Sequence, residues 1–146
     1  MLRPANKSDI PAMVELGAMH VASCSYKDFA YDRAKTAKAL SDLMDKHGFA
    51  VVAEQDGKIV GGMVGDVVEM WFSTTRLGIE HIIFIHPKYR GPRMAVRLIA
   101  AWEKWCKIQK CEYIQASVTS GHFGAANLYA RLGFEYVGPN FRKRID

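Results

Sequence analysis

The chain has 146 residues, of which 49% are hydrophobic and 24% are charged, and its formal net charge is +5. This size and composition exclude a disordered chain and a small disulfide-stapled scaffold, and they indicate one domain over residues 1–146. No apolar run approaches the roughly 18 residues that a membrane span requires, and the first residues lack a secretory signal core, so we expect a cytoplasmic protein without membrane contact.

The first half of the chain predicts a strand, two helices and a β-hairpin. A short strand at residues 2–3 precedes a helix that Ser8 caps, because apolar residues then recur at helical spacing. Asp32 is the expected cap of a second helix, which Gly48 ends. Two β-rich runs then flank the Gln-Asp-Gly-Lys segment at 55–58, and Asp-Gly between such runs is typical of a tight hairpin.

The second half alternates strands and helices around one basic turn. A strand at 81–86 leads to a helix that begins near Arg93, and a strand at 112–119 leads to a short helix at 123–132. Gly133 ends that helix, and the β-rich segments after it form the closing strand, counted as one or two. The order β-α-α-β-β-β-α-β-α-β predicts an α/β (α+β) fold.

Cysteine spacing and the basic C-terminus carry little functional signal. Cys24, Cys106 and Cys111 form no C-x-x-C pair, so we expect reduced thiols and no metal site. The densest basic patch is the Arg-Lys-Arg run at 142–144. No aromatic stacking platform or recognised nucleic-acid motif accompanies it, so a solvated last strand is favoured over nucleic-acid binding.

The turn between the strand at 81–86 and the next helix has the properties of an anion site. Backbone N–H groups at a helix N-terminus lack intrahelical partners and lie at the positive end of the helix dipole, so they bind phosphate oxygens. Gly91 allows close approach of a ligand, and Arg90 and Arg93 add positive charge. A basic surface turn without a ligand is an equally good interpretation on these grounds alone.

This turn resembles the coenzyme A loop of the GNAT superfamily of N-acetyltransferases, which follows an Arg/Gln-x-x-Gly-x-Gly/Ala pattern. Two residues, Arg90 and Ala95, fit the pattern, and Arg93 stands where the pattern has its first glycine. The Arg93 side chain either covers the pyrophosphate with its guanidinium or fills the space that the pyrophosphate needs. The resemblance implies a cofactor-binding loop made of Arg90, Gly91, Arg93, Met94 and Ala95.

A second segment, LYARLGF at 128–134, is similar to the L-Y-x-(K/R)-x-G-F signature near the end of GNAT domains. The resemblance implies that Tyr129 is the general acid that protonates the departing coenzyme A thiolate. The alternative is a tyrosine that only packs in the core. The family's cofactor-contacting asparagine, seven residues before that tyrosine, falls at His122.

The resemblance extends over nearly the whole chain, since the opening LRPAN-x-x-D-I and the Asp-Gly hairpin also fit. It implies a mixed, mostly antiparallel sheet of six to seven strands flanked by about four helices. In that fold the strand at 81–86 splays from the strand at 113–118. Backbone groups near Phe84 and Ile85 would then pair with the pantetheine amides. Dimers through exposed strand edges are common in the family, so a homodimer is among its implications.

Three residues are candidates for the base that deprotonates the acceptor amine. Only one of Glu80 and His81 can face the gap if the strand alternates regularly, and His81 is preferred because histidine changes charge nearest to neutral pH. Glu69 is a further alternative, and a structural role for His81 is as well supported. His86, before Pro87, is interpreted as structural.

The leading hypothesis is an N-acyltransferase that transfers acetyl from acetyl-CoA, as co-substrate, to a primary amine by direct attack. The acceptor is a small molecule or a protein amine, and no diagnostic pattern defines it. The alternative is a catalytically inert GNAT-fold protein with a binding or assembly role. A basic nucleic-acid-associated module is the weakest interpretation.

Overall fold

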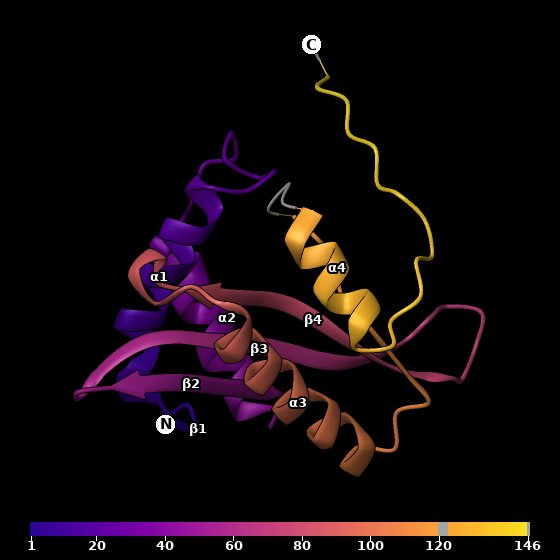
Figure 1. Ribbon diagram of the computed structural model, residues 1–146, viewed down its shortest axis with the longest axis horizontal. Coiled ribbons are helices and arrows are strands. Elements are labelled where there is room, and N and C mark those ends of the chain that lie inside the picture. The colour runs from indigo at the N-terminus through magenta and orange to yellow at the C-terminus, as the bar shows by residue number, and fades with distance from the viewer. Residues whose placement is uncertain (120–122, 146) are drawn as a thin grey trace.

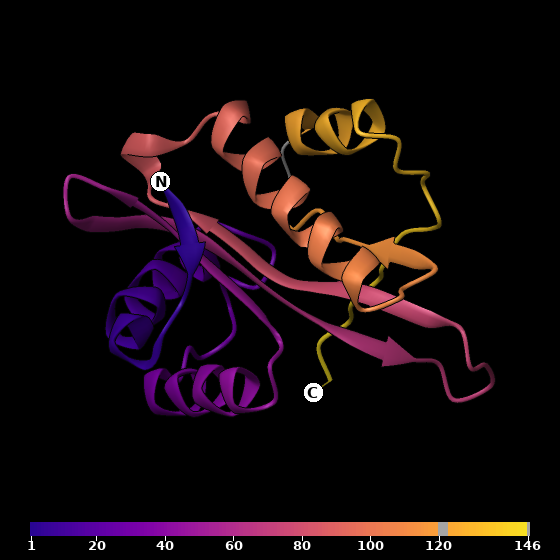
Figure 2. The same ribbon diagram turned by 90° about the horizontal axis from the view of Figure 1, so that it is seen from below.

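The computed structural model describes residues 1–119 and 123–145. Figures 1 and 2 show a twisted sheet with α1 and α2 on one face and α3 and α4 on the other. No helix within the described residues combines the length and the apolar content needed to cross a membrane. The elements are β1 (Leu2–Pro4), α1 (Ile10–Ala22), α2 (Arg33–Asp45), β2 (Phe49–Gln55), β3 (Lys58–Glu69), β4 (Arg76–Ile85), α3 (Pro92–Ile108), β5 (Tyr113–Gln115) and α4 (Phe123–Arg131).

The described strands form one sheet in the order β1-β2-β3-β4-β5. Neighbours are antiparallel from β1 to β4, whereas β4 and β5 are parallel. The predicted hairpin between β2 and β3 is confirmed, with positive φ of 50° at Asp56 and 73° at Gly57, as a type I′ turn requires. The mixed α/β class predicted from the order of elements is therefore confirmed.

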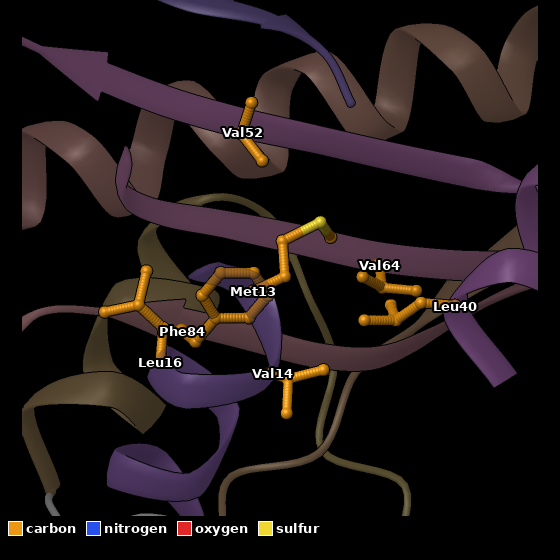
Figure 3. Close-up of a cluster of buried hydrophobic side chains, with 7 residues drawn as sticks. All are labelled: Met13, Val14, Leu16, Leu40, Val52, Val64 and Phe84. Carbon is orange, nitrogen blue, oxygen red and sulfur yellow. The ribbon is translucent and has the colours of Figure 1, made fainter. Parts of the chain in front are cut away.

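Two apolar clusters cover the two faces of the sheet. On the α1 and α2 face, Figure 3 shows the buried side chains of one cluster, which are Met13, Val14, Leu16, Leu40, Val52, Val64 and Phe84. On the α3 face, the buried members are Phe49, Met63, Leu98, Ile99, Trp102 and Cys106. The α3 members recur at helical spacing, so this helix lies lengthwise on the sheet.

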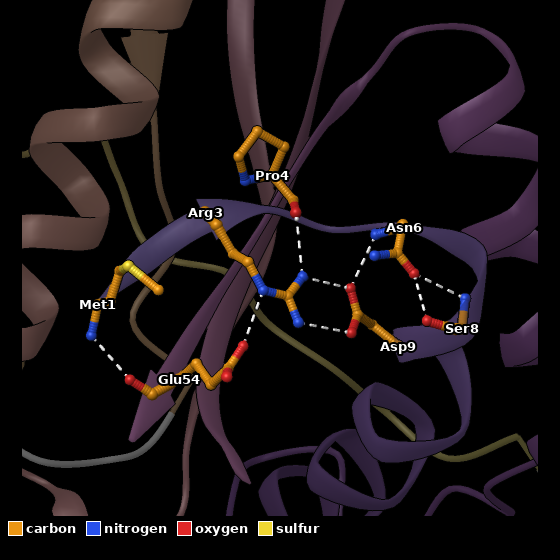
Figure 4. A network of polar contacts seen from close by, with 7 residues as sticks. All are labelled: Met1, Arg3, Pro4, Asn6, Ser8, Asp9 and Glu54. Carbon is orange, nitrogen blue, oxygen red and sulfur yellow. Dashed lines mark hydrogen bonds and ion pairs between the residues drawn. The ribbon is translucent and has the colours of Figure 1, made fainter. Parts of the chain in front are cut away.

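A polar network fastens the start of the chain to β2 (Figure 4). Asp9 is buried and accepts two hydrogen bonds from the Arg3 guanidinium, at 2.8 and 2.9 Å, and one from the Asn6 N–H at 2.8 Å. The hydrogen bonds from Arg3 are the largest cause that lowers the pKa of Asp9. The cap predicted at Ser8 is wrong, because the Asn6 side chain caps a short 3-10 turn and α1 begins only at Ile10.

The closing strands expected after Gly133 are a second correction. Residues 134–145 contain no strand, so the sheet has five described strands instead of six or seven. The expected strand at 112–119 also shortens to three residues. Gly138 has a φ of 129°, and Pro139 has no N–H to donate, so a regular ladder is interrupted in the middle of the segment. Figure 1 shows this tail running extended beside the domain without joining the sheet.

Candidate active site

The site is built on the edge of β4 that faces β5. The two strands pair over only three positions, Leu77–Ile79 with Tyr113–Gln115, after which β4 continues to Ile85 and the chain following β5 leaves the sheet. The strands therefore diverge from Glu80 onward, as the family resemblance implies. A stretch of β4 without a described strand neighbour on this side is left open.

The register of β3 and β4 decides which β4 backbone groups face the open edge. The His86 N–H donates to the Val60 carbonyl oxygen at 2.8 Å, so Phe84, two residues back, also directs its backbone groups toward β3. The intervening Ile83 and Ile85 direct theirs outward. Of the two residues named as pantetheine partners, Ile85 thus lies on the open edge and Phe84 does not, while Ile83 is an unforeseen third candidate.

A β-bulge in β4 determines which acidic or basic side chain reaches the site. Val64 pairs with Ile82, whereas Gly65 pairs with Glu80, so His81 has no partner on β3. Residues paired across two strands direct their side chains to the same face of the sheet. A Cβ at Gly65, the partner of Glu80, would lie 3.0 Å from Nε1 of Trp102, which belongs to α3. Glu80 therefore faces the α3 side of the sheet, and His81 is exposed.

Glu80 lies where β4 and β5 separate. Its Oε2 accepts a hydrogen bond from the Ser117 N–H at 3.3 Å, and the Ile83 N–H also donates to its carboxylate. Burial disfavours the charged form and raises the pKa of Glu80 to about 7, although the two backbone hydrogen bonds act in the opposite direction. A carboxylate with this pKa can accept a proton at neutral pH.

Tyr129 approaches the same place from α4. Its ring packs edge-on against Phe134 at a centroid distance of 5.0 Å, and the Phe134 N–H donates to the Tyr129 carbonyl at 3.0 Å across the positive-φ Gly133. Burial is the main cause that raises the pKa of Tyr129, and the negative charge of nearby Glu80 raises it further. The phenol stays protonated at neutral pH and can serve as a proton donor.

The basic turn lies at the far end of the open edge and presents the N-terminus of α3. Gly91 precedes α3 without a side-chain cap, Pro92 occupies the first helical position, and no acidic residue lies in the first turn. The N–H groups of Arg93, Met94 and Ala95 therefore have no intrahelical partner. The exposed Gly91 has open space where a Cβ would stand, so a ligand can approach the backbone.

Comparison with known proteins identifies the family of this chain. Residues 17–134 match the model of the acetyltransferase (GNAT) family. The chain belongs to this family. The GNAT membership predicted from the sequence, with the N-acetyltransferase class of enzyme that it implies, is confirmed.

Three solved structures illustrate the shared GNAT fold. An aminoglycoside 6′-N-acetyltransferase from Acinetobacter haemolyticus is 18% identical, with a TM-score of 0.77 over 100% of this chain and 99% of that one. A ribosomal-protein-alanine N-acetyltransferase from Brucella melitensis is 18% identical, with a TM-score of 0.80 over 94% and 86%. An aminoglycoside N-acetyltransferase in complex with CoA is 16% identical, with a TM-score of 0.79 over 99% and 93%.

The two arginines of the GNAT-like loop point in different directions. Arg90 donates from Nε to the Ile85 carbonyl at 3.3 Å and from Nη2 to Ser23 Oγ at 3.4 Å, which braces the turn against the end of α1. Burial and the charge of Arg90 together lower the pKa of His20. Arg93 is exposed at the helix N-terminus. Its guanidinium is therefore the better placed of the two for an incoming anion.

The other predicted site residues do not belong to the Glu80 and Tyr129 pair. Met94 is half-buried, and its Sδ would lie 3.1 Å from a Cβ on Gly61, so its side chain anchors α3 to β3 while its N–H stays in the turn. Glu69 is exposed at the end of β3 and pairs with Arg76 in the ladder, before the loop at 70–75. His122 lies outside the described residues. Ile83 and Ser117 could not be predicted from the sequence, because their backbone contacts depend on the bulge.

Proposed function

We propose that this GNAT protein transfers acetyl from acetyl-CoA to a primary amine by direct attack of the amine on the thioester. The observation that supports this most strongly is the position of Glu80 and Tyr129 at the fork between β4 and β5. A carboxylate with a pKa of about 7 and a protonated phenol lie close enough for the charge of one to shift the pKa of the other. This is the pairing of base and acid that aminolysis of a thioester requires.

The coenzyme would lie along the open edge of β4. The N–H groups at the start of α3 would hold its pyrophosphate, with Arg93 adding charge from the solvent side. The outward Ile83 carbonyl and Ile85 N–H would bind the pantetheine amides as an adjacent strand would, because Glu80 already accepts from the Ile83 N–H and Arg90 already donates to the Ile85 carbonyl. The thioester end would then lie toward the fork, because the start of α3 and the fork lie at opposite ends of the same open stretch.

The proton transfers follow from the two side chains. The acceptor enters as an ammonium ion, and Glu80 removes a proton to give the neutral amine. The nitrogen then forms a bond to the thioester carbonyl carbon, and the carbon–sulfur bond breaks. Tyr129 gives its proton to the departing thiolate, and the proton that the nitrogen loses as the amide forms restores the phenol through solvent. Glu80 releases its proton to solvent, so the products are the acetylamide and coenzyme A.

The acceptor class is a small-molecule or protein amine. Two of the structural relatives are named for aminoglycosides and one for the alanine of a ribosomal protein, so proteins of this fold serve both kinds of acceptor. The exposed loop between α1 and α2 and the loop at 70–75 are the segments of this chain available to contact an acceptor.

The proposal is tested in two steps. Acetyl-CoA should raise the melting temperature with increasing concentration, because a ligand that binds only the folded state stabilises it. Release of free thiol should then depend on an added amine in a panel of mono-, di- and polyamines. Absence of stabilisation at millimolar acetyl-CoA would contradict the proposal and favour an inert binding role for the fold.

A further inference from the structure

The loop between α1 and α2 presents two aromatic rings beside the proposed acetyl-transfer centre. Tyr26 and Phe29 pack edge-to-face, with ring centroids 5.2 Å apart and planes at 72°. Both rings remain substantially solvent-accessible, at 41% and 54% exposure. Adjacent aromatic faces with partial exposure form a site that attracts an organic cation through the ring quadrupoles.

A cation already occupies this pair of rings. The guanidinium carbon of Arg142, from the C-terminal tail, lies 4.5 Å from the Tyr26 centroid and 4.7 Å from the Phe29 centroid. Its Nη1 donates a hydrogen bond to the Ser25 carbonyl oxygen at 2.5 Å. The three groups together define what we call the cation cage: the rings of Tyr26 and Phe29 and the carbonyl of Ser25.

Hydrogen bonds connect the cation cage to the proposed transfer centre. The Ser25 N–H donates to the Thr119 carbonyl at 2.7 Å, which fixes the loop to the segment that leaves β5. Two residues earlier in that segment, the Ser117 N–H donates to Glu80. A cation in the cage therefore lies within a short stretch of chain from the carboxylate proposed as the base.

The segment that delivers Arg142 is weakly held. Residues 134–145 form no strand, and most apolar side chains of the tail face solvent, with exposures of 79% for Tyr136, 76% for Val137, 91% for Phe141 and 84% for Ile145. Figure 1 shows the tail extended away from the sheet. Few contacts oppose its local release, so a soluble cation can compete for the cage.

We propose that the cation cage binds a second cationic group of the acceptor, distinct from the amine that is acetylated, and that Arg142 occupies the cage as an internal competitor. The identification of this ligand as an acceptor rests on the proposed acetyl transfer. The substrate class is then an amine that carries a guanidinium or a further ammonium group. A guanidinium ligand fits best, because it can repeat both the ring stacking and the hydrogen bond of Arg142.

The test compares 4-aminobutylguanidine, which carries a primary amine and a guanidinium, with butylamine, which lacks the second cation. Arg142→Gln should lower the KM for 4-aminobutylguanidine about tenfold by emptying the cage, with kcat and the KM for butylamine nearly unchanged. Arg144→Gln is the matched control, since it removes the same charge from the same tail. Equal effects of the two substitutions would overturn the proposal.

A second variant removes the cage itself. Tyr26→Leu/Phe29→Leu should raise the KM for 4-aminobutylguanidine severalfold and leave the KM for butylamine unchanged, provided that the melting curve shows a folded protein. A similar loss for both amines would contradict a specific cation site. The comparison of Arg142→Gln with Arg144→Gln decides the proposal even if this double variant does not fold.

Binding without turnover separates this inference from the proposed function. Chemical shifts of the Tyr26 and Phe29 rings can be titrated with 4-aminobutylguanidine in the absence of acetyl-CoA. Tighter binding to Arg142→Gln than to the wild type, with no acetyl transfer to any amine, would support the cation cage and contradict the transferase proposal. Transfer to butylamine with no change in ring shifts would uphold the transferase and overturn the cage.

Discussion

The two edges of β4 are used in opposite ways. On one edge β3 pairs with β4 over nine residue positions, whereas on the other edge β5 pairs over three. On the closed edge, β3 pairs with the β4 backbone groups that point toward it, and the core packs on both faces of these two strands. The open edge leaves Ile83 and Ile85 with outward backbone groups beside Glu80. The difference shows how one strand can both stabilise a domain and provide a binding surface.

The side chains follow the same division. On the closed edge, glycines of β3 allow side chains and backbone to come close, since a Cβ at Gly62 would lie 2.6 Å from the Phe84 ring. On the open edge, burial raises the pKa of Glu80 and of Tyr129, and the Glu80 charge raises the pKa of Tyr129 further. Substitutions on the closed edge should therefore change folding stability, and substitutions on the open edge should change catalysis first.

The largest expected effect is at Tyr129. Tyr129→Phe should lower kcat by about 10³-fold, because general acid catalysis contributes roughly 10²–10⁴-fold and the phenylalanine keeps the packing on Phe134 but cannot donate a proton. The Kd for acetyl-CoA and the melting temperature should change little. Steady-state kinetics and a calorimetric titration measure the two quantities separately. An unchanged kcat would exclude Tyr129 as the acid.

Glu80 is expected to have the next largest effect. Glu80→Gln should lower kcat about 100-fold above pH 7 and remove the rise in rate that the ionisation of this carboxyl gives near its pKa of about 7. The matched control is His81→Ala, the adjacent exposed residue, which should keep both the rate and the pH profile. If His81→Ala flattens the profile instead, the base is His81, as the sequence analysis preferred.

The pH dependence of stability gives an independent measure of the Glu80 environment. The pKa of Glu80 is raised from its usual 4.5 to about 7, so the folded state binds this proton more tightly than the unfolded state. Its contribution to stability is fully present below about pH 4.5 and is lost as the pH rises through about 7. Urea unfolding at pH 5 and pH 8 measures the free energy of unfolding of Glu80→Gln and of the wild type. The difference in favour of the variant should be about 2 kcal/mol larger at pH 8 than at pH 5.

Much of the fold could be predicted because, apart from the cap placed at Ser8, local signals and global structure agree in the first 108 residues. The hairpin turn at Asp56-Gly57, the Asp32 cap of α2 and the apolar stripe of α3 are local patterns, and each is confirmed. The segment after Gly133 has β-rich composition but no described partner strand in the sheet. Strand pairing depends on distant partners, so composition alone overestimated the number of strands.

The candidate site was predictable to a smaller extent. The basic turn and Tyr129 belong to contiguous motifs, and the structure brings them to the two ends of the open edge. The choice between Glu80 and His81 depended on regular alternation, which the bulge opposite Val64 and Gly65 interrupts. A one-residue shift exchanges the faces of all later side chains. No pattern in the sequence indicates where such a bulge occurs.

On the closed edge, Gly65→Ala should reduce folding stability by about 2 kcal/mol. The added Cβ would lie 2.7 Å from the Ile79 carbonyl oxygen. The β4 backbone at Ile79 could move away only by disrupting its pairing with β3 beside the bulge. Gly124→Ala is the control, because a Cβ at that helical position has open space and alanine favours helix. Chemical denaturation of both variants measures the difference. An equal free energy of unfolding for the two variants would show that β3 accepts a Cβ at position 65 without loss of stability.

The smallest expected effect concerns Arg93, at the end of the open edge. The positive charge of Arg93 is repelled by the positive end of the helix dipole. An anionic ligand relieves this repulsion and binds both the guanidinium and the N–H groups at the start of α3. Arg93→Ala should therefore weaken acetyl-CoA binding about tenfold and reduce its salt dependence. Arg97→Ala, one turn further along α3 and also exposed, should change the affinity little. Tighter binding by Arg93→Ala would show that this side chain fills the space that the pyrophosphate needs.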